Sequence, residues 1–334
     1  LSGLTAGTIT LDTDTSTEAI DAAEVQGSIS NINTVFAENK ISGLSASAVT
    51  ITGGASVAQI NALTTTGTIT AAVSNGDMTS LAGITDATNA LSIAVTDASV
   101  DANALVALTA KTTGLVNVSA TSTLTGTLAE VTAALGATDD INGVGAMPVS
   151  VTGSITVAES IALHDLTTGL VSATITETDL DTLITLDTGN AWTVTVDKQT
   201  EEDPDTAGDQ LVTTLDVGDL NTLDGLTTQV VTVTAPAITG TLAEITTAFN
   251  ANTPADLADR TISGLETKAI TIEDTSITQA ELELAQDHST GVLTATIATG
   301  DVLGADGETQ GVKNSVATLA VDAFTDVDTN RTAG

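Results

Sequence analysis

The chain of 334 residues has no cysteine and no tyrosine, and it has only one tryptophan and three phenylalanines. Without cysteine it can form neither a disulfide nor a thiol-based catalytic or metal site. Aromatic residues make up 1% of the sequence against 41% hydrophobic residues, so any core must consist mainly of Val, Ile, Leu and Ala. Such side chains fill narrow layers, and the composition therefore favours a thin core like that of stacked repeat proteins.

Positive charge is also scarce, because seven Lys and Arg residues stand against 43 Asp and Glu residues, for a net charge of −36. No basic patch can be assembled, which excludes nucleic acid and anionic membrane surfaces as partners. No apolar run reaches the roughly 18 residues of a membrane-spanning helix, so we expect no membrane insertion. Salt screens the self-repulsion of such a chain, which suits it to salty or calcium-containing surroundings.

What the chain does contain is repetition. A ten-residue phrase occurs at 2–11, 42–51, 142–151 and 263–272, and each copy runs from a glycine to an apolar, small polar, apolar triplet. This pattern predicts a turn followed by a strand with one buried face. A second phrase, at 27–36, 126–135 and 240–249, places apolar residues three or four apart after a Ser or Thr. It predicts a short helix with an N-cap.

Between these phrases a helix-like segment leads to a strand, in most cases through a Thr-Thr-Gly or Ser-Thr-Gly turn. The pairs are 56–63 with 68–74, 100–108 with 115–120, 156–163 with 170–176, 216–223 with 229–235, and 276–284 with 292–298. Expected strand positions, such as Ile9, Ile29, Ile51, Ile69, Ile93 and Val116, recur at intervals of about 20 to 24 residues. We therefore predict an α/β solenoid of stacked strand–helix repeats, called coils below, with a parallel sheet.

The alternative fold is a string of β-sandwich domains, since Gly27, Gly126 and Gly240 are separated by about the length of an immunoglobulin-like module. The repeats predict a partial copy at 1–26 and modules at 27–125, 126–239 and 240–300. The second module contains an acidic loop at 198–210, and 301–334 is a cap or the start of a further module. The chain begins inside a repeat copy without Met or a signal peptide, so we expect processing or excision from a longer protein.

Clusters of oxygen-bearing side chains are candidate calcium sites, because calcium prefers six to eight oxygens gathered within a short span. The candidate ligands are Glu201, Glu202, Asp203, Asp205 and Asp209 in the acidic loop, Asp12 and Asp14 near the start, and Asp326, Asp328 and Asn330 near the end. A solvated acidic surface is the alternative. His164 and His288 have no second His or Cys at ligand spacing, and we expect no enzymatic activity.

Threonines alternate with apolar residues in several expected strands, as in Thr50 and Thr52, Thr193 and Thr195, and Thr232 and Thr234. They should lie opposite a buried Val and Ile face. Such ladders resemble the surfaces of ice-binding proteins, although threonine is also a common solvent-facing strand residue and the coil lengths are irregular. Phe36 and Phe249 share a column with Leu135 and are expected in the core, and Trp192 is expected in the core or as a loop anchor.

The Thr-, Ala- and Asp-rich coils, with the recurring phrases I-S-G-L and G-T-L-A-E and the T-T-G turns, resemble the long repetitive surface proteins of bacteria. This group includes surface-layer-like, filament and adhesive proteins. The resemblance implies an extracellular, cell-surface protein that binds calcium and associates with copies of itself, with cell-surface polysaccharide as a further partner. We predict a structural subunit of a layer or filament. The alternatives are an adhesin, an ice-binding protein and a polysaccharide-active solenoid enzyme, the last disfavoured by scattered cations and the lack of Tyr.

Overall fold

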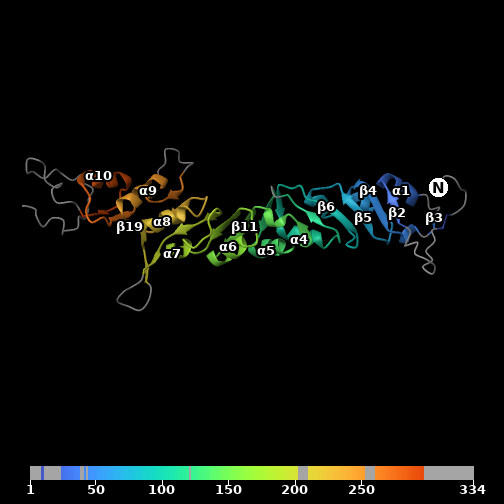
Figure 1. Ribbon diagram of the computed structural model, residues 1–334, viewed down its shortest axis with the longest axis horizontal. Helices are drawn as coiled ribbons and strands as arrows, with labels where there is room; N and C mark the ends of the chain where they lie inside the picture. The colour runs from blue at the N-terminus through green and yellow to red at the C-terminus, as the bar shows by residue number, and fades with distance from the viewer. Residues whose placement is uncertain are drawn as a thin grey trace, which may run out of the picture. The chain divides into compact units, whose positions relative to one another are not determined.

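The computed structural model describes residues 9–10, 24–37, 41–42, 44–119, 122–201, 210–252 and 260–296. Within these residues, ten α-helices alternate with strands that pair in parallel with strands of neighbouring coils (Figure 1). The predicted α/β class with parallel sheets is therefore confirmed. The chain divides into two compact units: the first comprises Leu1–Thr152 and Leu163–Val171, the second Gly153–Ala162 and Ser172–Gly334.

The first unit contains two sets of parallel strands, in the orders β10-β8-β6-β5-β4-β2 and β11-β9-β7, and a separate pair β1-β3. Its strands are β1 (Ile9–Thr10), β2 (Val25–Gly27), β3 (Ile41–Ser42), β4 (Val49–Ala55), β5 (Ile69–Val73), β6 (Ala90–Ala94), β7 (Ser99–Asp101), β8 (Val116–Asn117), β9 (Thr123–Gly126), β10 (Ile141–Asn142) and the first part of β11 (Val149–Ile155). Its helices are α1 (Ile29–Ala37), α2 (Val57–Asn61), α3 (Met78–Leu81), α4 (Ala102–Thr109) and α5 (Leu128–Gly136), with 3₁₀ turns at Leu44–Ala46 and Val144–Ala146.

The second unit repeats the arrangement, with parallel pairs β12-β13 and the parallel orders β14-β18-β20 and β17-β19-β21-β22. Its strands are β12 (Val171–Ile175), β13 (Ala191–Thr193), β14 (Thr195–Val196), β15 (Gln199–Glu201), β16 (Gln210–Val212), β17 (Thr214–Asp216), β18 (Val231–Val233), β19 (Ala237–Gly240), β20 (Ile262–Ser263), β21 (Ala269–Ile272) and β22 (Leu293–Thr294). Its helices are most of α6 (Val157–His164), then α7 (Leu180–Leu183), α8 (Val217–Asp224), α9 (Leu242–Asn252) and α10 (Gln279–His288).

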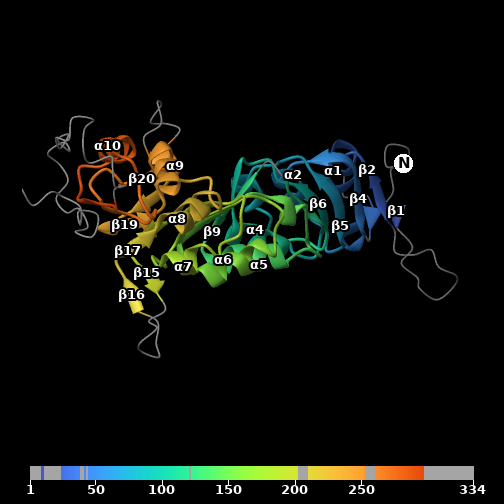
Figure 2. The ribbon, with the colours of Figure 1, turned by 60° about the vertical axis from the view of Figure 1, so that its left-hand side comes forward.

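Helices of successive coils pack on one another in both units, α4 on α5 in the first and α8 on α9 and α9 on α10 in the second (Figures 1 and 2). Each contributes a column of buried apolar residues, such as Val131, Ala134 and Leu135 of α5. Trp192 and Phe249 are fully buried, and the Trp192 indole N–H donates to the Asp187 carbonyl at 2.8 Å, as expected for a core residue that anchors a loop. The core is thus built from small aliphatic side chains with rare aromatic additions.

A three-residue turn ties each of several coils to the preceding one. The Thr167 hydroxyl accepts the N–H of Gly169 and donates to the carbonyls of Gly145 and Met147, while the Thr168 N–H donates to Gly145 at 2.8 Å. The turns at 65–67, 112–114 and 289–291 make the same bonds. A Cβ at Gly169 would overlap the Met147 carbonyl, which explains the glycine. The T-T-G phrase is therefore a coil-to-coil clasp.

Most helices begin where the sequence predicts. The capping box Thr127–Glu130 is formed, and the N–H of Glu130 donates to the Thr127 hydroxyl. Helix α10 instead begins after a capping box at Thr278 and Glu281, two residues beyond the expected start at Ser276. The expectation of a strand at Ile29 is wrong, because strand β2 ends at Gly27 and Ile29 begins α1. The single-turn helices α3 and α7 were not predicted, since four residues are too few to show a helical period.

The acidic insertion begins and ends in structure that the sequence did not suggest. The strands that flank it, β15 and β16, pair in antiparallel fashion, with Gln199 opposite Val212 and Glu201 opposite Gln210 (Figure 2). Residues 199–201 and 210 of the loop predicted over 198–210 therefore belong to strands, and 202–209 lie outside the described residues. Elsewhere the parallel pairing of successive strands does not fit the antiparallel sheets of the β-sandwich alternative.

Candidate functional site

Threonines from successive parallel strands lie on one exposed sheet face of the second unit. Along β12, β13, β14 and β18, residues alternate between buried apolar side chains and exposed threonines, because successive strand residues point to opposite faces. Ile175, Val194 and Val233 are on the buried side. The exposed residues, which together with Ser263 of β20 we call the threonine face, are Thr174, Thr176, Thr193, Thr195, Thr232 and Thr234.

The strand register places these hydroxyls in rows. Thr174 pairs with Thr193 and Asp179 with Lys198, which puts Thr176 opposite Thr195. Thr195 in turn pairs with Thr232, and Thr232 with Ser263. One row of four hydroxyls therefore crosses four strands, at a spacing of about 4.8 Å between neighbouring strands.

A second row runs parallel to the first through Thr174 and Thr193. The register that pairs Thr195 with Thr232 sets Val230 beside Thr193, and Val230 is 40% exposed. The face thus offers methyl groups as well as hydroxyls.

Only part of this hydroxyl array is used within the chain. The Thr234 hydroxyl donates to the Val196 carbonyl at 3.2 Å and the Ser263 hydroxyl to the Val231 carbonyl at 3.3 Å. Among the described residues, none forms a hydrogen bond with the hydroxyls of Thr193, Thr195 or Thr232. Each can donate one hydrogen bond and accept others, so the face can pair with either kind of polar group.

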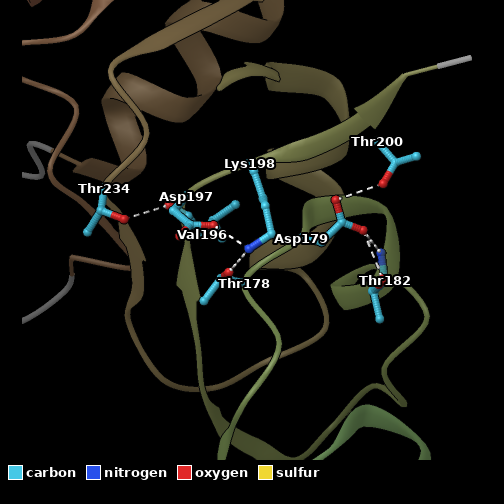
Figure 3. Close-up of polar contacts among 8 residues, drawn as sticks. All are labelled: Thr178, Asp179, Thr182, Val196, Asp197, Lys198, Thr200 and Thr234. Carbon is cyan, nitrogen blue, oxygen red and sulfur yellow. Dashed lines mark hydrogen bonds and ion pairs between the residues drawn. The ribbon is translucent and has the colours of Figure 1, made fainter. Parts of the chain in front are cut away.

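An ion pair marks one margin of the threonine face (Figure 3). Lys198 lies 3.0 Å from the Asp197 carboxylate and also donates to the Thr178 hydroxyl. The hydrogen bond from Thr178 is the largest influence on the pKa of Asp197 and lowers it, and Lys198 lowers it further. Lys198 thereby balances the negative charge of Asp197. A second carboxylate at this face, that of Glu177, accepts the Thr176 hydroxyl at 2.9 Å.

On the other side of Lys198, a polar network holds strand β15, where the acidic insertion begins. The Asp179 carboxylate accepts the N–H and hydroxyl of Thr182 and, at 3.1 Å, the hydroxyl of Thr200 (Figure 3). The side-chain amide of buried Gln199 donates to Asp181 at 3.0 Å and to Asp219 at 2.9 Å.

Asp219 is the carboxylate of this network whose pKa is raised. Burial is the main cause that raises the pKa of Asp219, and the nearby carboxylates of Asp216 and Asp181 raise it further. The Gln199 side-chain amide lies between the carboxylates of Asp181 and Asp219 and donates a hydrogen bond to each. The network therefore holds strand β15 in place through hydrogen bonds.

The predicted calcium ligands are mostly beyond what the structure describes. Glu201 is the last residue of β15. The remaining candidates lie outside the described residues: Glu202, Asp203, Asp205, Asp209, Asp12, Asp14, Asp326, Asp328 and Asn330. Within the described part of the chain, no three His, Cys, Asp or Glu side chains gather closely enough to hold a metal ion. Calcium at these segments stays a prediction.

Many described carboxylates serve helix N-termini instead. Glu130, Glu159, Glu244 and Glu281 each accept the backbone N–H of the N-cap threonine three residues earlier. A second set reaches from the next coil to the first N–H of a helix, as Asp97 does to Met78 at 2.8 Å and Asp274 to Leu242 at 2.7 Å. The positive end of the helix dipole favours an acid at both positions. These carboxylates therefore have a structural role.

Sequence reasoning found part of the threonine face. The pairs Thr193 with Thr195 and Thr232 with Thr234 were predicted to lie opposite a buried apolar face, and this is confirmed. It missed Thr174 and Thr176, which have the same T-x-T pattern, and it missed Lys198 and Gln199. His164 and His288 are the last residues of α6 and α10.

No family model, curated protein or solved structure matches this chain. The described residues include no helix with the length and apolar character needed to cross a membrane.

Proposed function

We propose that this chain is an extracellular structural protein whose coils form an open solenoid and which assembles with copies of itself into a surface layer or filament. The observation that carries the proposal is the recurrence of the same coil-to-coil bonds in both units. Thr65, Thr112 and Thr167 clasp carbonyls of the preceding coil in the first unit, and Ser289 does so in the second. Repeated bonds of this kind support a scaffold.

The helix caps support the same conclusion. Side chains of a following coil bind the first helical N–H of the preceding one at Val57, Met78, Val157 and Leu242, through Asn75, Asp97, Glu177 and Asp274. Polar side chains that a catalytic site would hold free are here engaged in linking coils. We therefore propose no catalytic role.

The charge and the strand edges suggest how copies associate. A net charge of −36 keeps copies apart at low ionic strength, and divalent cations or salt reduce that repulsion. The outermost strands of an open parallel stack leave unpaired backbone groups to which another copy can add. We propose that calcium bound by the acidic segment 201–209 promotes assembly, and that cell-surface polysaccharide is a further partner.

Electron microscopy of the purified chain, once with millimolar calcium and once with a chelator, tests this proposal. We expect ordered sheets or filaments in calcium that disperse in chelator. A magnesium sample at equal ionic strength controls for simple screening. Isolated particles under all three conditions would exclude self-assembly by this chain and favour the adhesin alternative.

A further inference from the structure

We propose that the threonine face of the second unit is a self-complementary contact through which two copies of this chain pair laterally. This inference rests on the proposed self-assembly and names a surface for it, distinct from the strand edges at the ends of the stack. The partner on this face is the same face of a second copy.

The first argument is electrostatic. Two copies of a chain with 43 acidic and seven basic residues avoid mutual repulsion where uncharged surfaces meet. The rows of the threonine face are such a surface, because their residues are hydroxyl-bearing or aliphatic. At its margin, Asp197 is paired with Lys198 at 3.0 Å and the Glu177 carboxylate accepts the Thr176 hydroxyl at 2.9 Å. Interface centres are depleted of charged side chains for the same reason.

The second argument concerns symmetry. In a two-fold contact the same patch occurs on both partners, so it must complement itself. A hydroxyl meets this requirement because it donates and accepts at once. The hydroxyls of Thr193, Thr195 and Thr232 are exposed and, within the described residues, have no hydrogen-bond partner, so they are available to a facing row.

The third argument is the apolar component. Val230 is 40% exposed in the row beside Thr193, and each threonine adds a methyl group. Burial of these groups against a partner removes apolar surface from water, which favours association. A regular sheet with short side chains also permits close approach, as in stacked sheets about 10 Å apart.

Disulfide trapping in the full chain tests the contact directly. Since the protein has no cysteine, Thr195→Cys and Thr232→Cys each introduce a single thiol on the threonine face. Thr70→Cys introduces one at an exposed strand threonine of the first unit and serves as the matched control. Under mild oxidation in assembling conditions, we expect covalent dimers from the face variants in clear excess over the control.

A charge insertion gives the complementary test. Thr232→Glu adds like charges to the two facing surfaces and should abolish lateral pairing in electron micrographs, whereas Thr70→Glu should not. Trp192, the one tryptophan of the chain, is fully buried next to Thr193. Its fluorescence emission therefore reports whether the second unit of each variant remains folded.

The outcomes separate this inference from the proposed function. If the wild-type chain does not assemble at all, the proposed function fails first. If it assembles, but Thr232→Glu assembles equally well and Thr195→Cys cross-links no more than the control, this contact is overturned while self-assembly stands. If instead the wild type inhibits ice recrystallisation and Thr232→Glu loses only that property, the face binds ice and the pairing is likewise overturned.

Discussion

The two units use the same coil-to-coil clasp but differ in regularity. In the first unit, hydroxyls bond backbone carbonyls 18 to 25 residues earlier in the chain, as for Thr65 and Thr125. In the second unit, the separations range from 21 residues for Thr176 to 35 and 38 residues for Thr227 and Thr234. Extra residues are therefore accommodated between neighbouring strands of the second unit without loss of parallel pairing.

The difference extends to buried polar atoms. Among the described residues, those of the first unit include no buried side-chain polar atom without a hydrogen bond, whereas Asp224, Asn252, Arg260 and Gln286 of the second unit have such atoms. Both described ion pairs, Lys198 with Asp197 and Arg260 with Glu266, also lie in the second unit. Buried polar atoms without hydrogen bonds are rare in proteins and concentrate at functional or irregular regions. We therefore expect specific interactions in the second unit.

The largest effect is expected from breaking a clasp. Gly169→Ala forces a methyl group into the Met147 carbonyl and should lower the free energy of unfolding by about 3 kcal/mol or more. Gly291→Ala, which would overlap the Lys268 carbonyl, should do the same in the second unit. Urea unfolding followed by circular dichroism measures both.

Gly136→Ala provides the control for these variants. A Cβ at this position at the end of α5 meets no atom, so the substitution should be neutral or stabilising by up to about 1 kcal/mol. Equal losses at positions 136 and 169 would show that the clasp glycines are not needed for close approach.

A medium effect is expected from repairing an unsatisfied residue. When the capping boxes at Thr241 and Thr278 are superposed in sequence, Gln286 of α10 corresponds to buried Phe249 of α9. Both amide atoms of Gln286 are buried and have no hydrogen-bond partner among the described residues. Gln286→Leu should therefore stabilise the protein by about 1–3 kcal/mol, the usual cost of an unsatisfied buried polar group. A lowered urea midpoint would mean that the amide has a partner in solution.

The contrast between units also explains what the sequence could predict. Local signals were reliable: the spacing of Val131, Leu135 and their equivalents predicted α5 and α9, and T-T-G predicted the turns at 65–67, 112–114 and 167–169. The rows of the threonine face were not predictable, because they depend on which strands become neighbours. With unequal coil lengths, no fixed period leads from Thr195 to Thr232. Contacts such as Lys198 with Thr178 likewise exist only after the strands are paired.

A smaller effect is expected at Asp219, where burial and neighbouring acids raise the pKa. Because the folded protein holds this proton more tightly than the unfolded chain, the charge destabilises the fold at neutral pH. Asp219→Asn should stabilise the protein at pH 7, by less than about 1 kcal/mol after solvent screening. The gain should disappear as the pH falls through the raised pKa towards the ordinary value of 3.8. A gain that is constant with pH would show that charge is not the cause.

The capping acids should show the opposite sign, and equally in both units. Hydrogen bonds from Thr127 lower the pKa of Glu130, and those from Thr278 lower the pKa of Glu281, from an ordinary value of 4.5. Their contribution to stability is complete above that value and is lost as the pH falls through the lowered pKa. Glu130→Gln and Glu281→Gln retain an acceptor for the N-cap N–H but carry no charge. Each should therefore reduce the loss of stability at acidic pH, measured as the melting temperature between pH 2 and 6. Asp139→Asn, at an exposed position, is the control. A loss of pH dependence in one variant only would mean that helix starts of the two units are not equivalent, and that regularity fails at the level of local capping as well as coil length.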